Sequence, residues 1–72
     1  MNHVDFTYGD SVCMLISGDA NQILGTYGIM VKGDVLNARY LHNLGAFLIK
    51  RNGFFEDSER ESVERLSEFL CM

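Results

Sequence analysis

The chain has 72 residues, which leaves room for one domain and no linker. Hydrophobic residues make up 47% of it, charged residues 22%, and proline is absent, a composition that excludes a disordered or low-complexity chain. The net charge of −4 argues against direct nucleic-acid binding, because an acidic protein repels phosphate backbones. No apolar run approaches the roughly 20 residues that span a bilayer, so we expect one complete domain over residues 1–72 and no membrane contact.

The cysteines and the start of the chain indicate the compartment. Cys13 and Cys71 are too few for the disulfide scaffold of a small secreted protein, although one bridge between them is the alternative. Residues 1–10 lack the basic start and apolar centre of a signal peptide. We therefore expect two reduced thiols in a cytoplasmic protein.

The beginning of the chain predicts a β-hairpin. Residues 4–8 alternate between apolar and polar, as a half-buried strand does. Gly9-Asp10 suits a two-residue type II′ turn, and residues 11–17 are apolar almost without a break, as in a central strand. The predicted register sets Phe6 opposite Cys13 and Val4 opposite Leu15.

A third strand is predicted after the next turn signal, Gly18-Asp19-Ala20-Asn21. The segment from residue 22 to residue 32 is rich in β-forming side chains. Gly25 and Gly28 weaken a strand interior, so the regular part is expected near residues 26–32.

A first helix is predicted between residues 35 and 51. Asp34 suits the capping position, and Asn52-Gly53 suits the end of the helix. Apolar residues recur between them at helical spacing. The predicted apolar stripe contains Val35, Ala38, Leu41, Leu44, Gly45 and Leu48.

A second helix is predicted near the C-terminus, where Ser58 and Glu61 fit a capping box. Its predicted apolar face contains Val63, Leu66, Phe69 and Leu70. The predicted element order is βββαα. The fold class is therefore α+β, with a three-stranded antiparallel meander and both helices packed on one face.

Residues that hold metals or act as nucleophiles are sparse. The candidate metal ligands are His3, Cys13, His42 and Cys71, and they lack the short paired spacing of a zinc site. Cys13 with His42 is the one nucleophile and base pair to consider, and an apolar strand makes a thiol inert by raising its pKa. We expect no metal, no cofactor and no catalytic residue, and hence no enzyme.

Charge is concentrated near the C-terminus, where residues 52–72 hold six acids against two bases. Glu61, Glu64 and Glu68 fall on one stripe of the second predicted helix. This stripe is either a solvated face that keeps a small protein soluble or a ridge that meets a basic surface of a partner.

Aromatic side chains supply the other candidate contacts. Phe54 and Phe55 lie in the connection between the predicted helices, where one is expected to pack inside and the other to anchor an interface. Tyr40 shares a stripe of the first predicted helix with Phe47, away from its leucines. A small domain cannot readily cover all of these rings, which favours an interaction surface.

The leading hypothesis is a small acidic module that inhibits or regulates a larger partner protein by occupying a surface on it. Anti-defence inhibitors carried by phages and other mobile elements have this general character. The alternative is a self-assembling structural subunit without catalytic activity, such as a homodimer that pairs through aromatic side chains or an open sheet edge.

Overall fold

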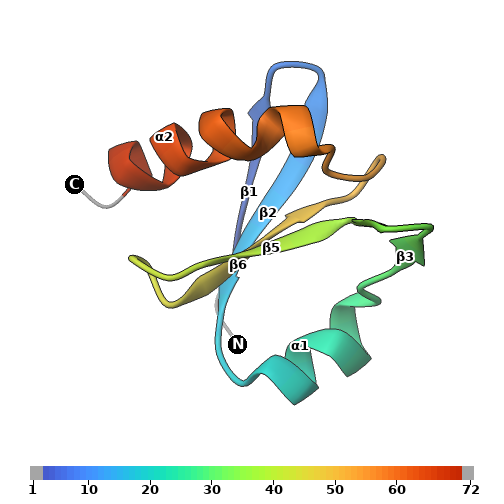
Figure 1. Ribbon diagram of the computed structural model, residues 1–72. Coiled ribbons are helices and arrows are strands. Elements are labelled where there is room, and N and C mark those ends of the chain that lie inside the picture. Colours follow the sequence, from blue (N-terminus) through green and yellow to red (C-terminus); the bar gives the residue numbers. More distant parts are fainter. Residues whose placement is uncertain (1–2, 71–72) are drawn as a thin grey trace.

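The computed structural model describes residues 3–70, which form a four-stranded antiparallel sheet, a two-stranded hairpin and two α-helices (Figure 1). The elements in chain order are β1 (His3–Tyr8), β2 (Ser11–Ser17), α1 (Ala20–Tyr27), β3 (Val31–Lys32), β4 (Val35–Leu36), β5 (Ala38–Leu41), β6 (Ala46–Lys50), the 3-10 helix η1 (Asp57–Glu59) and α2 (Arg60–Leu70). The predicted α+β class is confirmed, but the structure has more strands than the predicted three-stranded meander.

The predicted first hairpin is confirmed. Strands β1 and β2 pair antiparallel, with Phe6 opposite Cys13 and Val4 opposite Leu15. Gly9 adopts a φ of 60° at the first central position of the turn, a conformation that glycine reaches without strain.

The segment predicted as a third strand begins with a helix, α1. The Asp19 carboxylate accepts a hydrogen bond from the Asn21 N–H at 2.9 Å, and Gly28 ends the helix in left-handed geometry at a φ of 62°. Ile23 is fully buried against the sheet. The strand prediction was wrong for residues 22–27, because a cap at each end favours a helix and β-propensity is strongly context-dependent. Within the predicted segment only Val31–Lys32 forms a strand, β3, which pairs with β4 and not with the main sheet.

The segment predicted as the first helix is a hairpin, in which β5 and β6 pair antiparallel and Gly45, at a φ of 59°, helps to reverse the chain. Asp34 lies in the turn between β3 and β4 and caps no helix. Leu48 and Ile49 are buried on opposite faces of β6. A strand that is covered on both faces is apolar throughout and does not alternate between apolar and polar residues. The helix prediction was wrong because such an apolar run is compatible with a helix or with a buried strand.

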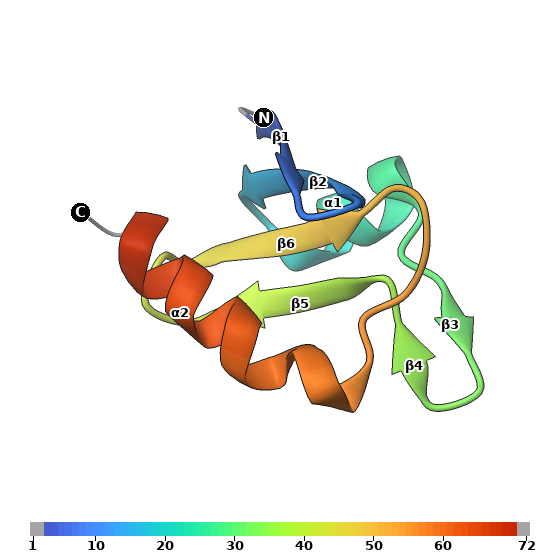
Figure 2. The ribbon, with the colours of Figure 1, turned by 90° about the horizontal axis from the view of Figure 1, so that it is seen from above.

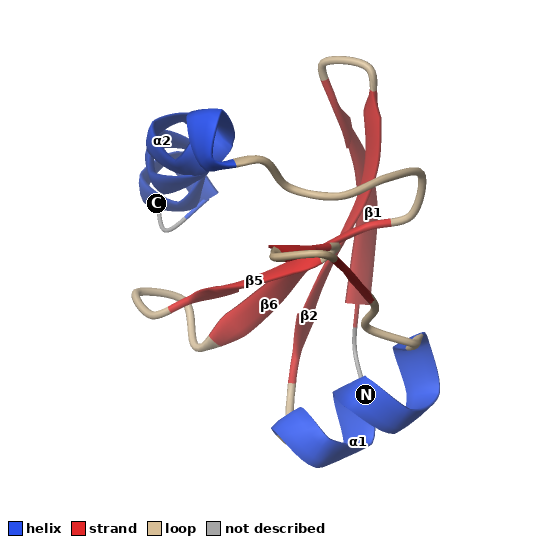
Figure 3. Cartoon of the chain, turned by 45° about the vertical axis from the view of Figure 1, so that its right-hand side comes forward, coloured by secondary structure: helices blue, strands red, loops and turns tan. Residues whose placement is uncertain are grey.

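The sheet has the strand order β1-β2-β6-β5 and carries apolar side chains on both faces. On one face α2 packs on a cluster formed by Cys13, Leu41, Leu48, Phe55 and Val63. On the other face α1 packs on a cluster formed by Met14, Ile16, Ile23, Ala38 and Ile49. The helices therefore lie on opposite sides of the sheet (Figure 3). The prediction that both helices cover one face was wrong, because β2 and β6 carry apolar side chains on both faces and both faces need a cover.

The predicted C-terminal helix is present as α2, with a different cap. The Glu59 carboxylate accepts a hydrogen bond from the Glu56 N–H at 3.0 Å, two residues earlier than the predicted pair of Ser58 and Glu61. Phe69, which was predicted to face the core, is 70% exposed. Within residues 3–70, neither helix is long and apolar enough to cross a membrane.

Candidate functional site

The edge strand β5 lies beside helix α2 (Figure 2). Side chains of the two elements line a groove between them. It consists of two adjoining hollows of about 490 Å³ each. The strand contributes Ala38, Arg39, Tyr40 and Leu41. The helix contributes Arg60, Val63, Glu64, Ser67 and Glu68. We call this feature the β5–α2 groove.

The helix wall of the groove is one face of α2, because its residues follow each other at spacings of three and four. Val63 and Ser67 are buried and form the part nearest the sheet, whereas Glu64 and Glu68 are exposed on the rim. The Ser67 hydroxyl donates to the Glu64 carbonyl at 2.7 Å, so the buried hydroxyl has a partner.

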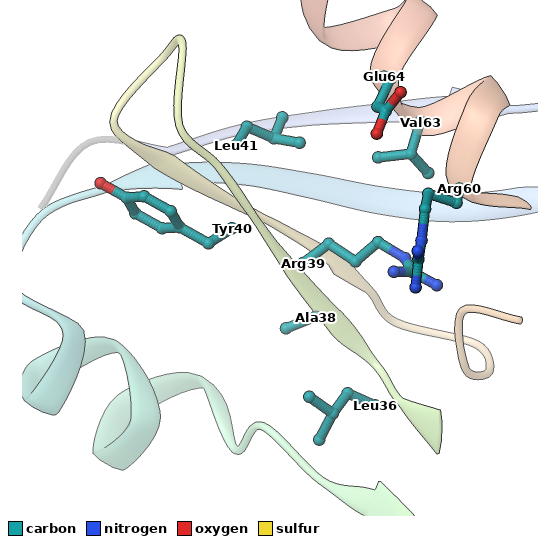
Figure 4. A pocket seen from close by; sticks show the side chains of 8 residues that line it. All are labelled: Leu36, Ala38, Arg39, Tyr40, Leu41, Arg60, Val63 and Glu64. Atoms are coloured by element: carbon teal, nitrogen blue, oxygen red, sulfur yellow. The ribbon is translucent and has the colours of Figure 1, made fainter. Parts of the chain in front are cut away.

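The two ends of the groove differ in charge. Arg39 and Arg60 line one end, and Figure 4 shows their side chains pointing toward the same part of the groove. The Arg39 guanidinium donates to the Glu56 carbonyl at 3.0 Å, and its Nε is buried without a hydrogen-bond partner among residues 3–70. Glu64 lines both hollows, and Glu68 lines only the other end. The groove therefore has a basic end and an acidic end.

An ion pair between the buried Lys50 and the partly buried Glu59 lies just before the start of α2. Lys50 Nζ lies 2.9 Å from a Glu59 carboxylate oxygen, donates to the Phe54 carbonyl at 3.2 Å and lies 5.1 Å from the centre of the Phe55 ring. Only 10% of the Lys50 side chain and 26% of the Glu59 side chain are exposed. These contacts join β6 to η1 and so set the position of the helix wall.

This pairing also sets the ionisation of Glu59. Burial alone raises the pKa of its carboxyl, but hydrogen bonds from Lys50 and from the Glu56 N–H, together with nearby positive charge, outweigh burial. The net pKa of Glu59 lies below its ordinary value. The carboxylate is therefore charged, as a partner for a buried ammonium must be.

The structure divides the predicted acidic stripe. Glu64 and Glu68 face the groove, whereas Glu61 forms an exposed ion pair with Arg65 at 2.7 Å. Both side chains of this pair are more than three-quarters exposed. Glu61 lies outside the groove lining and is the natural control for its two neighbours.

The predicted aromatic anchors have different surroundings. Phe55 is 2% exposed and belongs to the core, and Phe54 is half-buried. Tyr40 is 47% exposed on the edge strand, and its ring contacts those of His42 and Phe47 at centroid distances of 4.9 and 5.0 Å. Tyr40 and Phe47 lie directly opposite each other on β5 and β6, rather than along one helical stripe.

Among the described residues, the candidate metal ligands His3, Cys13 and His42 do not form a metal site. Burial raises the pKa of the Cys13 thiol, and the Lys50 charge offsets this only in part. His42 is exposed in the loop after β5 and contacts Tyr40. Within residues 3–70, no group of three or more histidine, cysteine or acidic side chains is placed to hold a metal ion. Cys71 lies outside the described residues.

Sequence reasoning missed the strand wall of the groove and its basic end, Arg39 and Arg60. Arg39 lies within the segment predicted as the first helix, and the short strand Ala38–Leu41 lacks the strict alternation of apolar and polar side chains that would have marked it as a strand. Comparisons with known protein families, with curated proteins and with solved structures find no match. The chemistry of the groove is therefore the basis for assigning a function.

Proposed function

We propose that the chain is a small acidic protein-binding module that inhibits or regulates a larger partner by occupying a surface on it, as anti-defence inhibitors of phages and mobile elements do. The β5–α2 groove would be its binding site. The observation that carries the proposal is the pair of exposed carboxylates, Glu64 and Glu68, on the rim of a groove with a partly apolar lining. An apolar centre with a polar rim is the usual anatomy of a protein interface.

The charge of the chain favours a partner with a basic surface. The net charge is −4, and residues 52–72 hold most of the excess acid. Rim charges act mainly on the rate of association, because they attract an oppositely charged partner before contact. Salt is therefore expected to weaken binding by screening this attraction.

Charge reversal on α2 tests the proposal. A tagged chain captures its partner from a lysate of the native host, and mass spectrometry identifies the partner. With that purified partner, Glu64→Lys should slow association about tenfold, the low end of the range for electrostatic steering, and reduce its salt dependence.

The matched control is Glu61→Lys, which makes the same charge change on the same helix outside the groove. It should change association much less than Glu64→Lys does. Equal effects of the two variants would assign the attraction to net charge and not to the groove. No effect of either would contradict the acidic binding surface.

Self-association is the second candidate. Phe69 and Val4 are 70% and 63% exposed, and both outer strands of the four-stranded sheet have an open side. Exposed apolar side chains and open sheet edges are common routes to a dimer. Sedimentation over a range of concentrations separates this candidate from the first, because a binding module for another protein has no need to dimerise.

A further inference from the structure

Strand β5 is the last strand of the four-stranded sheet, and its outer edge pairs with no other strand among residues 3–70. The Lys50 N–H donates to the Asn37 carbonyl at 2.7 Å, so the backbone groups of Asn37 point toward β6. In an antiparallel pair, successive residues point their backbone groups alternately toward the partner strand and away from it. Arg39 therefore turns its backbone groups toward β6, whereas Ala38 and Tyr40 turn theirs outward. Neither of these two residues makes an outward backbone hydrogen bond within the part of the chain that the structure describes.

We propose that an extended segment of the partner protein adds to this edge as a fifth strand of the sheet and lies in the β5–α2 groove. The inference rests on the proposed function and specifies its ligand. In strand addition, main-chain hydrogen bonds supply affinity and neighbouring pockets select side chains. Here Ala38 and Tyr40 offer the backbone groups, and Leu41 and Val63 offer apolar contact below the rim of α2.

The charges of the groove define the segment. Strand β5 and helix α2 run in the same general direction (Figure 2), from the basic end toward the acidic end. At about 1.5 Å per residue, Glu64 lies about 6 Å and Glu68 about 12 Å along the helix from Arg60. A strand advances about 3.3 Å per residue, and only alternate side chains face α2. The segment therefore carries an acidic and a basic side chain two or four residues apart.

A second copy of the chain fits this edge poorly. Two copies that pair antiparallel through β5 would both carry α2 on the same face of the joined sheet. Because α2 lies beside the β5 edge (Figure 2), the two helices would compete for the space above the join. In the register that sets Ala38 opposite Tyr40 of the other copy, the two Arg39 side chains would also meet, and like charges directly opposite are destabilising. A segment without its own flanking helix avoids both problems.

Selection of peptides tests the proposal and does not require the partner itself. Random eight-residue peptides displayed on a carrier are selected against the immobilised chain, and the enriched ones are synthesised. We expect β-forming sequences with an acid and a base two or four residues apart. Hydrogen exchange measured by NMR should slow at least tenfold at the amides of Ala38 and Tyr40 when such a peptide binds. Exchange at the outward amides of β1, Asp5 and Thr7, should not change.

Proline variants supply the matched control. Tyr40→Pro removes one outward N–H without removing a bond to β6, and should weaken peptide binding at least tenfold. Thr7→Pro makes the same change on the outer edge of β1 and should leave binding intact. If Tyr40→Pro does not fold, the exchange measurement on the unaltered chain still decides the question.

Three results would overturn the proposal. Peptides that bind but leave exchange at Ala38 and Tyr40 unchanged would contradict strand addition, although protein binding at the groove would stand. Failure to select any peptide would show that the ligand is not an extended segment, and the partner assay with Glu64→Lys would still test the proposed function separately. Slower exchange at the same amides as the concentration of the chain alone rises would assign the edge to a second copy.

Discussion

Lys50 joins the sheet to the helix wall of the groove. Its side chain lies within the core, with its ammonium bonded to both Glu59 carboxylate oxygens at 3.0 and 2.9 Å. On the neighbouring strand β2 it lies opposite Cys13, whose thiol is fully buried. A buried lysine is tolerated only when its charge is paired, so this position depends on Glu59.

Removal of the carboxylate charge should destabilise the fold. We expect Glu59→Gln to lower the free energy of unfolding at pH 7 by about 2–3 kcal/mol, less than the roughly 3–5 kcal/mol for a fully buried pair, since Glu59 keeps some exposure. Denaturant unfolding measures the change. Exposed Glu61→Gln is the control and should have a small effect, because exposed pairs of this spacing contribute only about 0.3–0.5 kcal/mol.

The same pair should make stability depend on pH. The pKa of Glu59 is lower in the folded chain than in the unfolded chain, so its contribution is fully present above the unfolded value of about 4.3. It is lost as the pH falls through the folded pKa. The difference between the unaltered chain and Glu59→Gln should therefore shrink as the pH falls from about 4.3 through the lower folded pKa. A difference that stays constant across this range would contradict the assigned ion pair.

At the scale of elements, the residues that cap α1 determine where this helix begins and ends. Asp19→Ala should destabilise the chain by about 1 kcal/mol, the typical loss for a helix cap, because the N–H groups of Asn21 and Gln22 lose their acceptor. Thermal unfolding followed by circular dichroism measures the loss. Asp34→Ala alters the residue that the sequence predicted as a cap and should stay within about 0.5 kcal/mol. A larger effect of Asp34→Ala than of Asp19→Ala would contradict the observed position of the helix.

Elements set by neighbouring residues could be predicted from the sequence. The first hairpin was predicted with its register because the turn at Gly9-Asp10 and the alternation in β1 are local. The C-terminal helix was predicted because its charge and apolar periodicity are local too. The middle of the chain could not be predicted in this way, since β6 is a strand only because α1 and α2 cover its two faces. That information belongs to the tertiary structure.

In the candidate site, too, the features set by neighbouring residues were predicted and those set by the tertiary structure were missed. Glu64 and Glu68 were identified because any helix over these residues places them on one stripe. The opposite wall was missed because its residues were assigned to a helix, which hides an open sheet edge. Of Phe54 and Phe55, one was predicted to pack inside and the other to be an anchor, and the buried ring is Phe55. A sequence alone does not show which of two adjacent rings turns inward.

At the scale of the whole molecule, most of the buried core residues lie in the sheet, and each helix buries few side chains against it. In α1 the only buried side chain is that of Ile23, and in the described part of α2 the buried residues are Val63 and Ser67. By contrast, β2 and β6 lie at the centre of the sheet and carry buried side chains on both faces. The helices therefore contribute less buried apolar surface per residue than the central strands.

Uneven burial predicts uneven resistance to local opening. Amide hydrogen exchange should be slowest in β2 and β6, near the limit set by global unfolding, and faster in α2, which can open alone because it buries few apolar side chains. Exchange measured residue by residue by NMR tests this order. Equal protection in α2 and β6 would contradict this order and would show that α2 does not open independently of the sheet. A helix that opens more readily lets the β5–α2 groove widen around a strand, and an added strand should in turn raise the protection of α2.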